Sequence, residues 1–292
     1  MVRPVIAALG GLVLLAGLCV PQTTAAAAPG SSTSPTVTTS PPSPTTVRIK
    51  SHHYAARGLD SCNAPTHSQM AAFWHNTRWW WWAIYIGGEN RACPNNNLTP
   101  RWIHREIRRG WGLQPIWVGP QAPCASQSGL ASMAHHRARA YRQGVRVAAH
   151  AYKKVKRLEI HTHTPVVYDM EAFDTTKRWC VRAVKAFVRG WSHQLGNRTN
   201  ALPGYYGSTC ASDVSAMWNI SPRPYYIWGA NYGTGPNTFK MSCVSKNIWP
   251  HRLKQYTGGS LVTENGVTLS VDRDCANGPM YSPRRHNLNI CT

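Results

Sequence analysis

Closely spaced carboxylates are the residues of this chain that most suggest chemistry. The 292-residue sequence has only 11 Asp and Glu against 32 Lys and Arg, yet Asp169 and Glu171 stand together at the end of the apolar run 165–168. On a β-strand both side chains point to one face, roughly 6.5 to 7 Å apart by backbone rise. Two carboxyl groups that close shift each other's pKa, so one can hold a proton while the other is ionised. Glycosidic bond cleavage uses that division of roles.

Four further acids fall near the ends of predicted strands: Asp60, Asp174, Asp272 and Asp274. In an α/β barrel the carboxyl ends of the strands form the active-site face. Each acid could instead pair with one of the surplus Arg and Lys side chains, and for Asp174 and Asp274 we expect this ordinary ion pairing. The pair at 169 and 171 ends a strand that its apolar residues predict to be buried. A functional role is favoured there, because an unpaired buried carboxylate is costly.

Short apolar runs that alternate with helical patterns predict the elements that must position these acids. Predicted strands cover residues 57–60, 82–86, 113–118, 166–170, 203–207, 225–229, 253–256 and 267–272. A helix is predicted over 100–109, with Thr99 as its cap and Pro100 in its first position. The later strands are separated by Gly-, Pro- and Asn-rich segments with little room for helices. The pattern predicts an α/β TIM-like barrel with an incomplete helical ring, and a doubly wound sheet is the alternative.

Two further helices are predicted from apolar residues that recur at helical spacing. The first stripe consists of Val145, Ala148, Ala149, Tyr152, Val155 and Leu158. The second consists of Trp179, Ala183, Phe187, Val188 and Trp191. The run of four tryptophans at 79–82 is expected to start a strand and to pack mainly in the core.

The N-terminal residues predict export. Arg3 precedes an apolar run from Val5 to Val20, and small residues at 24–28 offer a cleavage site, as in a secretory signal peptide over 1–28. The run is shorter than the ~20 residues that a spanning helix needs, so we expect no membrane span. We then expect a Pro-, Ser- and Thr-rich linker over 29–56, a folded domain over 57–280 and a C-terminal tail over 281–292.

Eight cysteines remain after the predicted signal peptide, and an even number in an exported chain predicts disulfides. They are Cys62, Cys93, Cys124, Cys180, Cys210, Cys243, Cys275 and Cys291. Their pairing stays open at this point. Their spacing does not match a zinc motif, and the sequence has no H-E-x-x-H, P-loop or G-x-G-x-x-G. We therefore expect neither a metal nor a cofactor.

Several segments, taken in order, resemble a known family. They are GLDSCNAP (58–65), YIGG (85–88) with RAC (91–93), GWGLQPIWVGPQAPC (110–124), VVYDMEAF (166–173) and VDRD (271–274). Over about residues 56–276 the chain is similar to an actinobacterial secreted glycoside-hydrolase-like domain family of unknown function, related to the lysozymes of glycoside hydrolase family 25. The resemblance implies a barrel of five β/α units followed by three β-strands.

The resemblance also implies an active site that consists of Asp60, Asp169, Glu171 and Asp272. In the lysozyme relatives the Glu is the general acid, whereas the Asp residues orient and stabilise the substrate N-acetyl group, which attacks the anomeric carbon. IWGANYG (227–233) and the Gln-Tyr pair at 255–256 resemble segments that line the sugar groove there. The substrate-binding residues implied in this way are Trp228, Tyr232, Gln255 and Tyr256. The tryptophan run and the eight cysteines are not lysozyme features.

A net charge of +21 points to a polyanionic surrounding, such as nucleic acid, an anionic membrane or a bacterial cell wall. The basic residues are spread through the domain without a recognised nucleic-acid module, so no specific nucleic-acid partner is expected. We expect a monomeric, secreted and wall-associated glycoside hydrolase-like protein that acts on peptidoglycan-type glycan. A non-catalytic wall carbohydrate-binding protein on the same barrel is the main alternative, and a cationic nucleic-acid binder is a weaker one.

Overall fold

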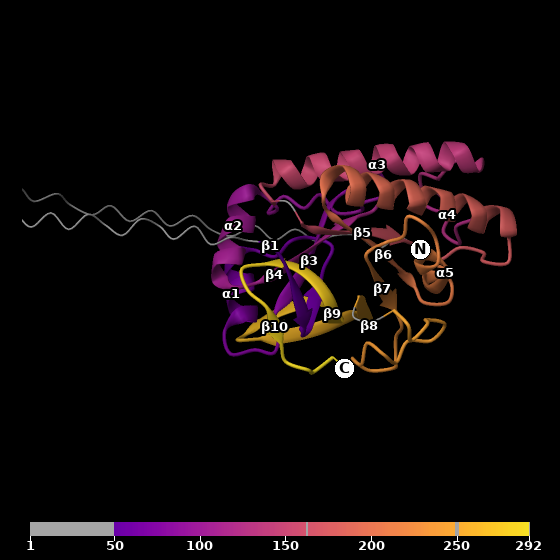
Figure 1. Cartoon of the computed structure of the whole chain (residues 1–292). Coiled ribbons are helices and arrows are strands. Elements are labelled where there is room, and N and C mark those ends of the chain that lie inside the picture. Colours follow the sequence, from indigo (N-terminus) through magenta and orange to yellow (C-terminus); the bar gives the residue numbers. More distant parts are fainter. Residues whose placement is uncertain (1–49, 162, 249–250, 292) are drawn as a thin grey trace, which may run out of the picture. The chain divides into compact units, whose positions relative to one another are not determined.

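The computed structural model describes residues 50–161, 163–248 and 251–291 (Figure 1). The predicted signal peptide over 1–28 and residues 29–49 of the predicted linker lie outside the described residues.

Eight strands form a closed barrel. In chain order they are β2 (Arg57–Asp60), β3 (Trp81–Gly87), β4 (Gly112–Trp117), β5 (Pro165–Met170), β6 (Leu202–Ser208), β7 (Tyr226–Ala230), β8 (Arg252–Glu264) and β9 (Val267–Ser282). From β2 to β8 each strand is parallel to the next, and β9 pairs antiparallel with both β8 and β2, which closes the ring. The predicted TIM-like barrel is confirmed, and the doubly wound alternative is wrong.

One helix follows each of the first five barrel strands. These helices are α1 (His67–Trp74), α2 (Pro100–Arg109), α3 (Arg137–Arg157), α4 (Arg178–Ser192) and the short α5 (Val214–Trp218), with a π-helical turn η1 (His193–Asn197) after α4. In the described part of the chain, no helix follows β7 or β8. Figure 1 shows α3 and α4 side by side, away from the β8–β9 side of the barrel. Five β/α units followed by three strands are the architecture that the sequence resemblance implied.

Two further strands extend the sheet beyond the barrel. β1 (Lys50–Ala55) pairs antiparallel with the second half of β9, and β10 (His286–Asn287) pairs with β1. β1 belongs to the segment predicted as linker, and β9 runs into the segment predicted as a C-terminal tail. Cys291, near the end of the described chain, is bonded to Cys275 in β9.

The start and end of α2 follow from local sequence. The Thr99 side chain accepts a hydrogen bond from the Trp102 backbone N–H at 3.2 Å, which satisfies one of the free donors of the first turn. Gly110 ends the helix with a φ of 115°, a conformation that a glycine adopts without strain. The predicted helix over 100–109 is confirmed to the residue.

The hydrophobic core has two layers, one inside the barrel and one between the barrel and its helices. Adjacent tryptophans of β3 illustrate them, because successive side chains of a strand point to opposite faces. Trp81 packs inside the barrel with Trp228, whereas Trp82 packs in the outer layer. Trp79 is also buried and Trp80 is partly exposed, so the expected core packing of the tryptophan run is confirmed.

Helices α3 and α4 approach closely where each has a glycine. A Cβ atom on Gly144 would lie 2.1 Å from the Phe187 carbonyl oxygen, and one on Gly190 would lie 2.1 Å from that of Tyr141. The buried face of α3 therefore includes Gly144 and differs in part from the predicted stripe. Its members are Ala140, Gly144, Val147, Ala148, Ala151 and Val155.

The predicted stripe of α4 needs one correction. Ala183, Phe187, Val188 and Trp191 are buried as expected, but the side chain of Trp179 is 40% exposed. Trp179 lies in the first turn of α4, beyond the crossing with α3, and its ring stacks on His135. Helical spacing alone could not show where the neighbouring helix α3 begins.

All eight cysteines of the described chain form disulfides, so the expected oxidised state is confirmed. The pairs are Cys62–Cys93, Cys124–Cys180, Cys210–Cys243 and Cys275–Cys291. Three of them connect the segments that follow successive strands: β2 with β3, β4 with β5, and β6 with β7. At the carboxyl end of the barrel, three disulfides therefore link segments that follow neighbouring strands.

Two buried cations organise the chain between β7 and β8, where the barrel lacks a helix. Arg252 donates hydrogen bonds to the carbonyl oxygens of Thr238, Ser245 and Ile248. The Lys254 ammonium contacts three further carbonyl oxygens at 2.6 to 3.4 Å, those of Thr234, Asn237 and Lys240. Burial lowers the pKa of Lys254 to about 8. These bonds satisfy backbone carbonyls that a helix would otherwise pair internally.

We expect Lys254→Met to lower the free energy of unfolding by about 2 to 4 kcal/mol, because three partly buried backbone carbonyl groups lose their charged donor. The measurement is urea unfolding of the oxidised domain at neutral pH. Lys246→Met is the matched control, because Lys246 is an exposed residue of the same segment. Equal losses in the two variants would show that Lys254 does not organise the loop.

Candidate active site

The pairing of β2 with β9 brings three carboxyl groups together inside one end of the barrel. Asp60 lies opposite Asp272 in the register, and Gly58 lies opposite Asp274. The sequence placed Asp272 and Asp274 at the carboxyl end of a last strand, and this was wrong. They lie within the long antiparallel β9, and they reach the same end as Asp60 because β9 runs in the opposite direction.

Gln255 of β8 connects these acids to two tyrosines. Its side-chain nitrogen donates to Asp60 Oδ2 at 2.7 Å and to Asp272 Oδ2 at 3.2 Å. Its side-chain oxygen accepts hydrogen bonds from the hydroxyls of Tyr206 and Tyr232, each at 2.8 Å. The amide is therefore held with its donors toward the carboxyl groups and its acceptor toward the phenols.

Asp60 is buried and surrounded by polar partners. The Tyr85 hydroxyl donates to Asp60 Oδ1 at 3.2 Å, in addition to the bond from Gln255. Burial, followed by the neighbouring charge of Asp272, raises the pKa of Asp60 to about 7, although the hydrogen bonds that the carboxyl group accepts act to lower it. Burial also raises the pKa of Asp272, whose Oδ1 accepts a hydrogen bond from the Gly259 N–H at 2.5 Å.

Asp274 is fully buried, and the expected ion pair with a Lys or Arg is wrong. Its Oδ1 accepts a hydrogen bond from Trp228 Nε1 at 3.2 Å. Its carboxyl group also lies beside that of Asp60, and the two can form a hydrogen bond when one of them carries a proton. Burial, followed by the charge of Asp60, raises its pKa well above the usual range. Sequence reasoning set this residue aside, although it forms part of the same carboxyl cluster.

Asp169 and Glu171 differ in exposure although they come from one strand. Asp169 lies near the end of β5, is 5% exposed, and has a pKa raised first by burial and then by the charges of Glu171 and Asp60. Glu171 lies just past the strand and is exposed. It lines a cavity of about 410 Å³ together with Tyr206 and Tyr232.

Gln121 holds the backbone at this carboxyl pair. Its side-chain nitrogen donates to the Asp169 carbonyl at 2.9 Å, and its oxygen accepts from the Glu171 N–H at 2.7 Å.

The roles of Gln121, Tyr85 and Tyr206 were not predicted from the sequence. Gln121 and Tyr85 lie in the motif segments 110–124 and 85–88, which was the available signal.

The four predicted sugar-groove residues lie in different surroundings. Tyr232 is 56% exposed beside the cavity, and Gln255 is bonded to the acids. Trp228 is only 1% exposed inside the barrel, so in this structure its ring cannot be a platform for a sugar. Tyr256 follows Gln255 at a register shift of β8, with Arg57 and Arg273 among its charged neighbours.

Asp174 forms the ordinary ion pair that the sequence predicts. Its carboxylate lies 3.4 Å from the Lys177 ammonium and accepts hydrogen bonds from Thr176.

Over the described ranges, no three His, Cys, Asp or Glu side chains are grouped as metal ligands. None of the helices described is both long and apolar enough to cross a membrane.

Comparison with known proteins gives a family and a fold. Residues 73–276 match the family described as Rv2525c-like, glycoside hydrolase-like domain. The structure is similar to that of the Tat-secreted protein Rv2525c of Mycobacterium tuberculosis, with 13% identity and a TM-score of 0.54 over 78% of this chain and 100% of that one. At this identity the likeness is one of fold. Among curated proteins, none matches this chain.

Two other similar structures have lower TM-scores. An uncharacterized protein of B. stearothermophilus is 19% identical, with a TM-score of 0.49 over 76% of this chain and 95% of that one. A family 25 glycosyl hydrolase of Bacillus anthracis is 13% identical, with a TM-score of 0.44 over 78% and 93%.

The raised carboxyl pKa values predict an unusual dependence of stability on pH. Between an unfolded value of about 4 and the folded value of about 7 for Asp60, the folded state binds more protons than the unfolded state. The stabilisation is complete below about pH 4 and is lost as the pH rises through 7, at about 1.4 kcal/mol per pH unit for each such proton. Asp169 and Asp274 add to this loss in the same direction.

We expect Asp274→Asn to raise the melting temperature at pH 8, to change it little at pH 4, and so to reduce the slope between them. The amide keeps an acceptor for Trp228 and cannot ionise. Thermal unfolding across this pH range measures the slope, with Asp174→Asn as the exposed control. An unchanged slope in Asp274→Asn would show that this group does not titrate with folding.

Proposed function

Because the chain belongs to the family of Rv2525c-like, glycoside hydrolase-like domains, we propose that it acts on cell-wall glycan of the peptidoglycan type by lysozyme-like hydrolysis. One observation carries the proposal. A cluster of buried carboxyl groups at one end of the barrel lies beside an exposed carboxylate, Glu171, that lines a cavity. Buried carboxyl groups without cationic partners are costly to fold, and such groups gather at functional sites.

Glu171 is the proton donor in this proposal. It is the predicted catalytic acid that is exposed to the cavity, so it can reach a glycosidic oxygen. Asp169 lies beside it, and burial raises the pKa of Asp169, so this neighbour holds its own proton more readily than an ordinary carboxyl group. A positioned general acid of this kind contributes roughly 10²- to 10⁴-fold to the rate.

Asp60 and Asp272 position the substrate and stabilise positive charge at the anomeric centre. Glycosidic cleavage passes through an oxocarbenium-like transition state, which a nearby carboxylate favours. Gln255 bonds both carboxyl groups and limits their movement, so their orientation is set before a substrate arrives. Tyr232 offers an exposed ring at the cavity for a sugar face.

The protein is secreted and associated with the cell wall in this proposal. Four disulfides require an oxidising compartment, and the predicted signal peptide supplies a route to it. The net charge of +21 favours retention on anionic wall polymers. The structurally similar Rv2525c is itself described as Tat-secreted.

A second candidate function is binding of wall glycan without turnover. It is favoured by how fully the acids are engaged within the protein. Asp60 and Asp272 accept hydrogen bonds from Gln255 and Gly259, and Asp169 is almost completely buried. A single freely exposed carboxylate could bind a sugar hydroxyl without completing a catalytic pair.

We expect Glu171→Gln to reduce the release of reducing ends from purified peptidoglycan by about 100-fold or more, because the amide cannot donate the required proton. Binding to the walls should persist. Asp174→Asn is the matched control, because it removes an exposed acid of the same segment that pairs with Lys177. That control should keep full activity.

The outcomes separate the two functions. Release by the wild-type protein and not by Glu171→Gln supports hydrolysis with this donor. Equal release by both proteins contradicts the role of Glu171. No release by either, with both proteins still pelleting with the walls, contradicts hydrolysis and supports glycan binding without turnover.

A further inference from the structure

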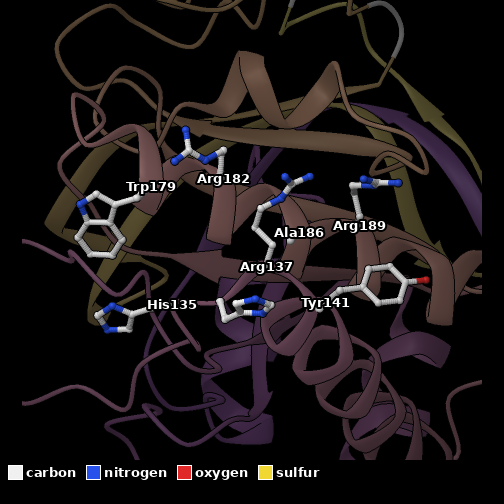
Figure 2. Close-up of a pocket in the computed structure, with 9 residues that line it drawn as sticks. His135, Arg137, Tyr141, Trp179, Arg182, Ala186 and Arg189 are labelled. Atoms are coloured by element: carbon white, nitrogen blue, oxygen red, sulfur yellow. The ribbon is translucent and has the colours of Figure 1, made fainter.

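A cationic groove lies between the first turns of α3 and one side of α4, away from the carboxyl cluster. Its volume is about 580 Å³. Figure 2 shows the guanidinium groups of Arg182, Arg137 and Arg189 in a row along it, with Trp179 and His135 at one end and Tyr141 at the other. It shares no lining residue with the cavity beside Glu171.

The groove continues past these arginines. A second hollow of about 350 Å³ shares Arg137, Arg182 and Arg189 with the first and adds Lys185. The two hollows therefore form one track along α4, lined by four cationic side chains. Arg189 is fixed by a hydrogen bond from its Nε to the Ser221 carbonyl at 2.6 Å.

No acid of the described residues forms an ion pair with these four cationic side chains. Neither α3 nor α4 contains an Asp or Glu in its sequence. Arg137, Arg182 and Lys185 have no ion-pair partner within the described ranges of the chain. Like charges on neighbouring helices repel, so an anion between them would remove an unfavourable interaction as well as add a favourable one.

The starts of the two helices add to the positive potential. The residues before them, His136 and Lys177, make no side-chain capping bond, and neither first turn contains an acid. In contrast, Thr66 and Thr99 cap α1 and α2. The free N–H groups and the helix dipoles at the starts of α3 and α4 therefore favour an anion beside the arginines.

The geometry suits an extended anion with a ring. Arg182 and Arg189 are two turns apart on α4, roughly 10 Å along its axis, so a ligand that engages both carries more than one anionic group. Trp179 is 40% exposed, and His135 stacks on its ring with centroids 5.1 Å apart at 11°. The histidine supports the indole in one orientation and leaves ring surface for a second flat or apolar face.

We propose that this groove binds a phosphodiester-linked wall polymer that carries sugar substituents. The phosphates contact Arg137, Arg182 and Arg189, and a sugar ring packs against Trp179. Guanidinium groups match phosphate oxygens in shape and charge, and they stay charged at every relevant pH. The choice of a wall polymer over nucleic acid rests on the proposed function, which places the protein at the wall.

The probes are three chains with the same number of phosphates: a glycosylated poly(glycerol phosphate), the same polymer without sugars, and an oligothymidylate. Binding to the full exported and oxidised protein is measured by fluorescence anisotropy over a range of salt concentrations. We expect Arg137→Gln/Arg182→Gln to reduce the slope of log K against log salt by about 1.4, since two phosphate contacts are lost. Its affinity should fall about tenfold or more at low salt.

Arg101→Gln/Arg108→Gln is the matched control, because it removes the same charge from exposed positions on α2. Its slope and affinity should stay close to those of the wild type. Trp179→Ala should weaken binding of the glycosylated polymer by about tenfold, as loss of a stacked ring does, and leave the sugar-free polymer unaffected. Equal losses in the two double variants would show that binding depends on total charge, which overturns the groove.

Two other results would also overturn the proposal. Tighter binding of the oligothymidylate than of the glycosylated polymer would assign the groove to nucleic acid. A similar loss for all three probes in Trp179→Ala would exclude a sugar contact. Glu171→Gln should bind the polymer like the wild type, so failure of hydrolysis and failure of this groove give separate results.

Discussion

The barrel and its carboxyl cluster both rest on the antiparallel pairing of β9 with β2 and β8. It closes the barrel, and its register places Asp272 opposite Asp60 and Asp274 opposite Gln255. A slip of one residue would turn these side chains from the interior to the outer face. The carboxyl cluster therefore assembles only when β9 closes the barrel in this register.

Burying the carboxyl cluster lowers the stability of the fold, and two features of the structure offset this loss. Polar neighbours such as Tyr85, Gln255 and Trp228 supply hydrogen bonds where cations are absent, and raised pKa values let the deepest acids stay neutral. Three disulfides then join the segments that follow neighbouring strands at this end of the barrel. Covalent bracing is therefore placed where the buried acids weaken the fold.

Charge is divided between the inside and the outside of the molecule. Much of the small acidic complement lies within the barrel end, whereas α3 and α4 carry basic residues and no acids. The outer surface can therefore attract a polyanion over a distance, while the cavity beside Glu171 lies apart from this basic surface. On this basic outer surface, the groove between α3 and α4 is a defined hollow lined by cationic side chains.

The local elements could be predicted from the sequence, because strand and helix periods and the Thr99 cap are properties of nearby residues. The even number of cysteines likewise predicted disulfides, although not their pairing. The sequence also indicated that Asp169 and Glu171 belong together, since they share one strand. Which faces point inward became clear only from the fold, which buries Asp274 and Trp228 and leaves Trp179 exposed beside the start of α3. The physical reason is that inward and outward directions are set by closure of the barrel, which joins strands that are distant in the sequence.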